Sequence, residues 1–226
     1  MSAWLLFDLD GTLTDNSEGI IKSARFALDR MGFPNEPDSV LRRFIGPPLH
    51  DSFMKFYGFS KEKAFEAVDN YRIRYKEKGV YENNLFPGLC EMLEELREKG
   101  AKLCVATSKP GVFTEVILKQ HGVYELFEHV VGSNLDGTLT DKTEVIREVL
   151  RRIGETEEPV IMIGDRSFDI IGANNCGLKS VGVYYGFADP GELEEAGATY
   201  IADTVSELKE ILINEIKRSD LFFNPD

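Results

Sequence analysis

The chain has 226 residues, of which 42% are hydrophobic and 29% are charged. These values are typical of a globular protein with one or two domains, and they exclude a collagen-like repeat, a disulfide mini-protein and wholesale disorder. The 26 Lys and Arg residues against 39 Asp and Glu residues give a formal charge of −13. A chain this acidic repels nucleic acid and anionic membranes on average, so an anionic substrate would need a local positive site.

The cysteine content predicts a reducing, cytoplasmic setting. The chain has three cysteines and no C-x-x-C pair, so neither a disulfide framework nor a thiolate zinc site is indicated. Apolar runs such as residues 4–7 are far too short to span a bilayer. The first residues meet Asp8 almost at once and do not resemble a signal peptide.

Short apolar runs bounded by Gly, Pro, Asp or Ser predict buried strands. Between them lie amphipathic patterns that end at glycines, as helices often do. This alternation predicts a doubly wound, mostly parallel, Rossmann-like α/β sheet. No clear period is present in residues 217–226, and we expect a mobile tail there. The predicted strands are residues 3–7, 102–106, 129–131, 160–163 and 180–183, with 199–202 as a further candidate.

Residues 16–81 break the alternation, because they show helical patterns without a convincing strand. A helical block inserted directly after the first strand is expected above the carboxyl edge of a parallel sheet, where such folds bind ligands. We therefore predict an all-helical cap domain at residues 16–81 and an α/β core domain at residues 1–15 and 82–226. Residues 13–16 and 81–86 are the expected two-stranded hinge.

The first predicted strand ends in two carboxylates, Asp8 and Asp10, followed by Gly11 and Thr12. At the end of a strand both side chains project together at the rim of the sheet. Two close carboxylates repel each other, and a divalent metal ion would relieve that repulsion and supply positive charge. Gly11 permits a tight turn, which we expect to leave backbone N–H groups available for an anion.

The D-x-D-G-T motif at residues 8–12, after a hydrophobic strand, resembles that of the haloacid dehalogenase superfamily. The resemblance implies that Asp8 is a nucleophile that forms an aspartyl-phosphate. It also implies that Asp10 is the general acid and base, which protonates the leaving group and then activates water. Dehalogenases of the superfamily lack the second Asp, so Asp10 favours phosphoryl transfer.

Three further parts of the family pattern follow in order. Thr107, helped by the backbone of Ser108, would bind the phosphoryl oxygens. Lys142, just before a predicted helix, would neutralise phosphate and nucleophile. Asp165 and Asp169 follow another strand; with Asp8 and Asp10, Asp165 would bind Mg²⁺, while Asp169 would assist it or orient Lys142. The resemblance covers almost the whole chain.

Each of these residues also has a plain structural interpretation. Asp-Gly is a common turn, which would account for Asp8 and Asp10. Thr107 has the character of a helix N-cap before Pro110, and Lys142 that of a solvated surface lysine. Asp169 falls within a helical turn and could simply be exposed. The four parts together, each at a strand end or a helix start, favour the catalytic interpretation.

The segment Leu-Asp-Gly-Thr-Leu-Thr-Asp occurs twice, at residues 9–15 and 135–141. The second copy has Asn134 where the first has Asp8, and an amide cannot be phosphorylated as a carboxylate can. It also lacks the apolar strand directly before it. We therefore assign the chemistry to the first copy and interpret the second as a loop that delivers Lys142.

A basic stretch interrupts the predicted cap in an otherwise acidic chain. It contains Arg43, Gly46, Pro47 and His50. One interpretation is a substrate-specificity loop that faces the nucleophile when the cap closes. The other is a turn between helices with two surface arginines.

Within the superfamily the chain resembles the phosphoglycolate phosphatase-like group, which also contains 5′-nucleotidases. We predict a Mg²⁺-dependent phosphatase of small phosphorylated metabolites, with no nucleic-acid or membrane partner, acting as a monomer or homodimer. Two alternatives stay open: a sugar phosphomutase of the β-phosphoglucomutase type, and a non-catalytic binding or regulatory protein on the same fold.

Overall fold

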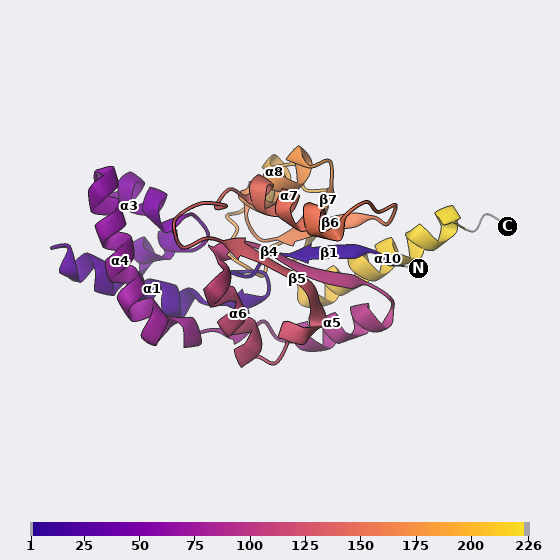
Figure 1. The fold of residues 1–226 in the computed structure, drawn as a ribbon, viewed down its shortest axis with the longest axis horizontal. Coiled ribbons are helices and arrows are strands. Elements are labelled where there is room, and N and C mark those ends of the chain that lie inside the picture. Colours follow the sequence, from indigo (N-terminus) through magenta and orange to yellow (C-terminus); the bar gives the residue numbers. More distant parts are fainter. Residues whose placement is uncertain (1, 224–226) are drawn as a thin grey trace. The chain divides into compact units, whose positions relative to one another are not determined.

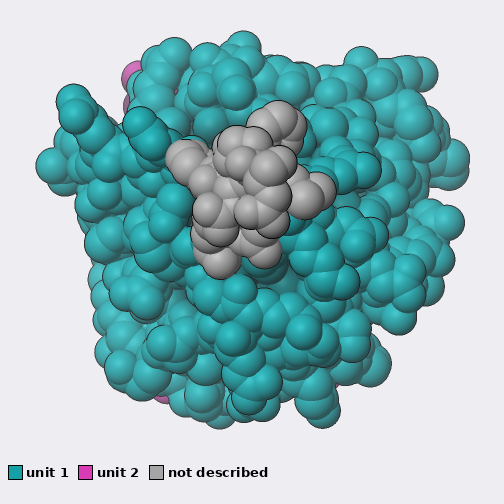
Figure 2. Space-filling model, turned by 90° about the vertical axis from the view of Figure 1, so that its right-hand side faces the viewer, with its two compact units in different colours: residues 1–14, 85–226 teal, residues 15–84 magenta. Residues whose placement is uncertain are grey.

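A computed structural model of the chain describes residues 2–223, with side chains up to residue 218. The chain divides into two compact units. The core unit comprises Met1–Thr14 and Leu85–Asp226, and the helical unit comprises Asp15–Asn84. The ribbon is drawn in Figure 1, and the two units are coloured separately in Figure 2.

The core unit contains a six-stranded sheet in the order β5-β4-β1-β6-β7-β8, with every neighbouring pair parallel. The predicted doubly wound parallel sheet is therefore confirmed. The strand β1 lies between β4 and β6, so the carboxyl ends of these three strands meet at one edge of the sheet. The strands are β1 (Trp4–Phe7), β4 (Lys102–Pro110), β5 (Phe127–Ser133), β6 (Val160–Gly164), β7 (Lys179–Val183) and β8 (Tyr200–Ala202).

Helices cover both faces of this sheet (Figure 1). On one face, α7 and α8 pack on alternate side chains of the central strands, in a buried apolar cluster that includes Leu6, Cys104 and Met162. The helices α5 and α6 lie on the opposite face, and α10 packs against α5. The helices and short 3₁₀ turn of this unit are α5 (Leu89–Glu98), α6 (Gly111–Gln120), η3 (Tyr124–Leu126), α7 (Lys142–Ile153), α8 (Ser167–Asn175), α9 (Glu192–Glu195) and α10 (Val205–Phe223).

Three elements are several residues longer than the sequence predicts, and one of them is β5, which spans Phe127–Ser133 where the sequence predicts residues 129–131. The strand β4 continues through Thr107 to Pro110, so Thr107 lies within a strand and is not a helix N-cap. The helix α10 continues to Phe223, so the expectation of an aperiodic tail from Lys217 is wrong up to that residue. Residues 224–226 lie outside the described part of the chain.

The helical unit is built around two longer helices, α1 and α4, which pack against each other. Its buried side chains include an aromatic group in which Phe44 and Phe53 have ring centroids 4.8 Å apart. The chain enters and leaves this unit through a two-stranded pair, β2 (Thr14–Asp15) and β3 (Asn84–Leu85). The elements of the unit are α1 (Ser17–Arg30), α2 (Asp38–Leu41), η1 (Arg42–Phe44), α3 (Leu49–Tyr57), α4 (Lys61–Glu77) and η2 (Gly79–Tyr81).

Among the described residues, no helix has both the length and the apolar character needed to cross a membrane.

The packing of β1 predicts the cost of a cavity in the core. Leu6 is fully buried in the apolar cluster beneath α7 and α8. We expect Leu6→Ala to lower the free energy of unfolding by about 3 kcal/mol, because truncation removes buried methyl groups and leaves a void. Urea denaturation followed by circular dichroism measures this, with Leu135→Ala as the matched control. Leu135 is 38% exposed, and a comparable loss in the control would contradict the assignment of the core.

Candidate active site

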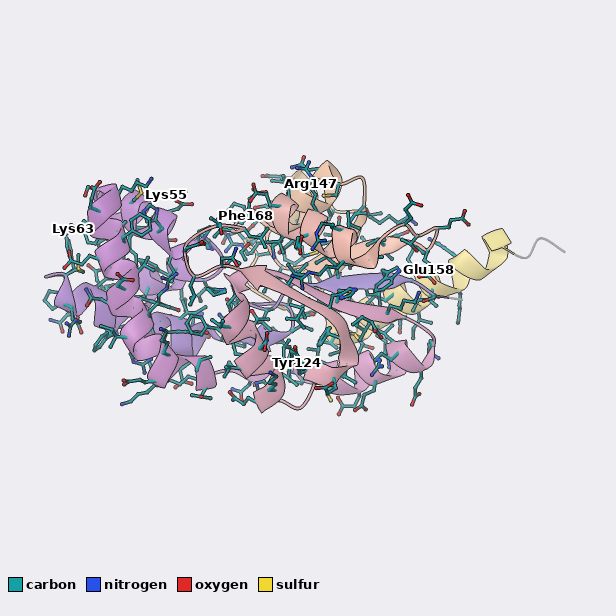
Figure 3. All side chains as sticks on the ribbon, in the orientation of Figure 1. Lys55, Lys63, Tyr124, Arg147, Glu158 and Phe168 are labelled. Carbon is teal, nitrogen blue, oxygen red and sulfur yellow. The ribbon has the colours of Figure 1, made fainter. Side chains whose placement is uncertain are left out.

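Four aspartates gather where β1 and β6 end. Asp8 directly follows β1 and Asp10 comes two residues later, while Asp165 directly follows β6. Asp169 lies in the first turn of α8, next to Phe168, which is labelled in Figure 3. The side chains of Asp8, Asp165 and Asp169 are buried, and their carboxylate oxygens lie within 4.8 Å of one another. Asp169 is therefore not the exposed helix residue of the alternative interpretation.

Lys142 joins two of these carboxylates. Its Nζ atom lies 2.7 Å from Asp8 Oδ1 and 2.7 Å from Asp169 Oδ1, and it donates to the Ala106 carbonyl at 3.0 Å. Burial disfavours the ammonium form, but the negative charges of Asp169 and Asp8 outweigh burial and raise the pKa of Lys142. Lys142 is thus a buried, charged residue and not a surface lysine.

The second Leu-Asp-Gly-Thr-Leu-Thr-Asp copy forms the connection that leads to Lys142. It follows β5, and its last residue, Asp141, is the N-cap of α7. The Glu144 N–H donates to the Asp141 carboxylate at 3.1 Å, which satisfies one of the unpaired donors of the first helical turn. Lys142 is the first residue of that helix, so the cap helps to place the lysine.

Asp165 is held by groups from two loops. Its Oδ1 accepts a hydrogen bond from the Thr12 hydroxyl at 3.2 Å, and its Oδ2 accepts one from the Phe187 N–H at 2.8 Å. The Tyr185 hydroxyl donates to the Thr12 carbonyl at 3.0 Å and so links the two loops. Gly11 has φ +83°, and a Cβ at this position would lie 2.1 Å from Asp165 Oδ2. Only glycine permits both this backbone conformation and this close approach.

Burial shapes the protonation of two carboxyl groups. The pKa of Asp165 lies well above its ordinary value, because burial and the charges of Asp169 and Asp8 disfavour ionisation more than the Phe187 N–H and Arg166 favour it. Burial also raises the pKa of Asp169, although Lys142 opposes that effect. In both groups burial is the largest cause, and the negative charge of Asp8 adds to it.

Asp10 pairs with Lys109, which is not among the predicted site residues. Lys109, near the end of β4, places its Nζ 2.9 Å from Asp10 Oδ1 and 2.8 Å from Asp10 Oδ2. Its side chain is only 6% exposed. The sequence predicts that this strand ends at residue 106, so Lys109 lay outside the predicted strand and its burial had no local signal. The Tyr185–Phe187 contacts were also missed, and no local sequence signal marks them.

The charge balance of this cluster suits a divalent cation. When all four carboxyl groups are ionised, the two ammonium groups leave two negative charges uncompensated. Carboxylate oxygens are the ligands that hard cations such as Mg²⁺ prefer. The three oxygens that lie within 4.8 Å of one another belong to Asp8, Asp165 and Asp169, so this group contains Asp169 in place of the predicted ligand Asp10.

The turn after Asp10 differs from the expectation of available amides. The Gly11 N–H donates to the Thr14 carbonyl at 2.8 Å, and the Thr12 N–H donates to the Leu9 carbonyl at 3.3 Å. The N–H groups of Gly11 and Thr12 therefore close the turn on itself and are not left for an anion. Thr107 is buried, and its hydroxyl oxygen accepts a bond from the Lys109 N–H at 3.2 Å. Ser108, beside it on β4, is partly exposed.

The four predicted specificity residues all belong to the helical unit. The guanidinium carbon of Arg43 lies 3.9 Å from the centre of the Phe56 ring. The His50 ring centroid lies 4.5 Å from that of Phe65. Gly46 has φ +98°, and Pro47 follows it in the turn before α3. These contacts are with residues of the same unit.

Comparison with known proteins identifies the family. Residues 5–183 match the model of the haloacid dehalogenase-like hydrolases. A 5′-nucleotidase of Pseudomonas aeruginosa is 46% identical over 209 residues, which cover 92% of this chain and 94% of that protein. The tyrosine-protein kinase PtkA of Mycobacterium tuberculosis is 36% identical over 92% of this chain and 72% of its own length. The crystal structure of a predicted phosphatase from Clostridium acetobutylicum superposes with a TM-score of 0.90 at 44% identity, covering 94% of this chain and 98% of that one.

The chain belongs to the haloacid dehalogenase-like hydrolase family, and its class within that family is that of a phosphatase. The predictions of the family, of a hydrolase and of a phosphatase are confirmed.

The buried Asp165 carboxylate is expected to lower the stability of the metal-free protein while serving as a metal ligand. In Asp165→Asn, the amide oxygen can still accept from the Phe187 N–H while the amide NH₂ donates to the Thr12 hydroxyl. Because ionising the native carboxyl costs folding energy, stability of the metal-free protein falls as pH rises above the ordinary Asp value of about 4. The variant lacks this loss, so at pH 7 in a chelator we expect it to be more stable by on the order of 1 kcal/mol.

Thermal unfolding in chelator and in Mg²⁺ measures both effects. The advantage of Asp165→Asn should vanish near pH 4, and Mg²⁺ should raise the melting temperature of the parent protein more than that of the variant. A variant that is less stable than the parent at pH 7 in chelator, or one stabilised equally by Mg²⁺, would contradict this account of the site.

Proposed function

We propose that this protein is a Mg²⁺-dependent phosphatase of small phosphorylated metabolites that works through an aspartyl-phosphate on Asp8. The observation that carries the proposal is the pairing of Asp8 with Lys142 at 2.7 Å, beside a second carboxylate that has its own lysine. The proposed nucleophile Asp8 and acid–base group Asp10 thus follow the same strand, β1, and the charge-neutralising cation Lys142 comes from the start of α7.

In the first half-reaction, a carboxylate oxygen of Asp8 attacks phosphorus. Lys142 contacts Oδ1, so we assign the attack to Oδ2. Asp10 takes up a proton before this step; the bond between phosphorus and the leaving oxygen then breaks, and Asp10 gives that proton to the leaving oxygen. Lys142 keeps the nucleophile oriented and reduces its repulsion of the substrate's negative charge.

In the second half-reaction, Asp10 takes a proton from water, whose oxygen attacks the phosphorus of the aspartyl-phosphate. The bond from phosphorus to Asp8 breaks, inorganic phosphate leaves, and both aspartates return to their starting forms. Thr107, on the neighbouring strand β4, is the proposed donor to the phosphoryl oxygens.

Asp8, Asp165 and Asp169 would hold the cation. When bound, it supplies positive charge that stabilises the phosphoryl oxygens as negative charge develops on them. The uncompensated charge of the cluster and the raised pKa values of Asp165 and Asp169 support such a site. The predicted participation of Asp10 in metal binding stays a prediction.

The substrate class we propose is a small phosphomonoester, with a nucleoside 5′-monophosphate as the first candidate. The support is the 46% identity to a protein named 5′-nucleotidase, extending over nearly all of both chains. We propose that residues 16–81 act as the cap, with Arg43 and His50 as candidate specificity residues. The cytoplasmic setting stays a prediction.

If Asp8 is the nucleophile, replacing one of its carboxylate oxygens by nitrogen should abolish its function. Asp8→Asn should reduce phosphate release by roughly 10⁴-fold or more, because an amide cannot form the acyl phosphate. The assay measures phosphate released with and without Mg²⁺ from nucleoside 5′-monophosphates, phosphoglycolate, pyrophosphate and glucose 1-phosphate. Asp136→Asn is the control for the same exchange at an exposed site, because Asp136 is the counterpart of Asp10 in the second copy of the heptapeptide and is exposed.

Retention of activity in Asp8→Asn would contradict the mechanism. Conversion of glucose 1-phosphate into an isomeric sugar phosphate, without free phosphate, would instead identify a mutase. If the parent protein forms no aspartyl-phosphate, the result would favour the alternative of a non-catalytic binding protein.

A further inference from the structure

Lys109, the buried lysine beside Asp10, lies outside the motifs that resemble the family pattern and has no role in them. Lys109 contacts both carboxylate oxygens of Asp10, at 2.9 and 2.8 Å. The exposed fractions of the two side chains are only 6% and 16%. A surface ion pair contributes little to stability, and a buried one costs desolvation energy. Placing this lysine at the sheet edge therefore calls for a reason other than stability.

The backbone around Lys109 is built to aim its side chain. The pairing of β4 with β5 shifts register between Ala106 and Pro110, and such irregularities redirect side chains at strand ends. The Lys109 N–H is held by the Thr107 hydroxyl at 3.2 Å. On β5, Gly132 makes room for the bend, since a Cβ at that position would lie 2.5 Å from the Lys109 carbonyl oxygen.

The contact geometry indicates orientation of the carboxylate. An ammonium group that contacts both oxygens of Asp10 restricts the rotation of the carboxylate about its own axis and its swing about the side-chain torsions. Each of the two reacting aspartates thus has a buried lysine as its partner: Lys142 contacts Asp8, and Lys109 contacts Asp10. A general acid and base must lie within hydrogen-bond reach of the atom it serves, and a misplacement of about 1 Å can cost 100-fold in rate.

We propose that Lys109 is a positioning residue that sets the Asp10 carboxylate for both half-reactions. The inference rests on the proposed function, in which Asp10 first protonates the leaving oxygen and then deprotonates water. Loss of Lys109 should therefore slow both proton transfers and leave the attack by Asp8 itself intact.

The test uses a substrate whose leaving group needs no proton. With p-nitrophenyl phosphate, Lys109→Met should form the aspartyl-phosphate quickly and hydrolyse it slowly, giving a burst of about one p-nitrophenolate per active site. The steady rate that follows should fall by about 30-fold. With a nucleoside 5′-monophosphate the first step is slow as well, so no burst of nucleoside is expected. A merely structural defect would lower all rates without accumulating the intermediate.

Three further variants complete the experiment. Lys102→Met is the matched control: Lys102 begins the same strand and pairs with Glu158 at 2.7 Å, and its loss should leave activity unchanged. Lys109→Arg keeps a cation that can contact both oxygens, so it should abolish the burst and restore the steady rate to within about 5-fold. Lys109→Arg also replaces Lys109→Met in the test if Lys109→Met does not fold. If packing alone mattered, the larger arginine side chain would disrupt the protein at least as severely as methionine.

The variant Asp10→Asn distinguishes a failure of the proposal for Lys109 from a failure of the proposed function. It should show the burst whether or not Lys109 matters. A burst in Asp10→Asn, with neither burst nor loss of rate in folded Lys109→Met, would overturn the role of Lys109 and leave the proposed function standing. If Asp10→Asn shows no burst either, the two-step mechanism fails and the proposal for Lys109 fails with it.

Discussion

The repulsion between four aspartates at one edge of a parallel sheet is the constraint on which the rest of the core unit depends. In a medium of low dielectric constant, such charges must be paired, hydrogen-bonded or neutralised by protonation. The sheet order answers this requirement, because β1 lies between β4 and β6. Asp8 then meets Asp165 from one neighbouring strand, while Lys109 on the other neighbour meets Asp10.

Each contact around the cluster reduces that repulsion without abolishing it. The two lysines cover Asp8, Asp10 and Asp169, whereas Asp165 has hydrogen bonds from Thr12 and Phe187. Hydrogen bonds to neutral donors lower the cost of a buried charge less than a cation does. The negative charge of Asp165, a proposed metal ligand, is therefore the least compensated of the four. A cation bound there would reduce the electrostatic cost of the buried charge.

The extent to which sequence predicts this molecule follows from how local each signal is. Buried strands such as β1 and β6 were predictable, because an apolar run and the polar residue that ends it are adjacent. The end of β4 was not, since Ser-Lys-Pro is a poor strand sequence and its pairing depends on Gly132 of another strand. The Asp10–Lys109 pair joins residues 99 apart, and the Phe187–Asp165 bond comes from a loop with no motif.

The repeated heptapeptide shows what local sequence decides and what it does not. Gly11 and Gly137 have φ values of +83° and +87°, so both copies make a left-handed turn at the same position. Yet Asp10 pairs with a buried lysine, whereas Asp136 is exposed and accepts from Thr138 of its own turn. The first copy follows the central strand β1, with neighbours on both sides, and the second follows the edge strand β5, with one. The same seven residues thus form a candidate active site where two strands flank them and a solvated loop where only one does.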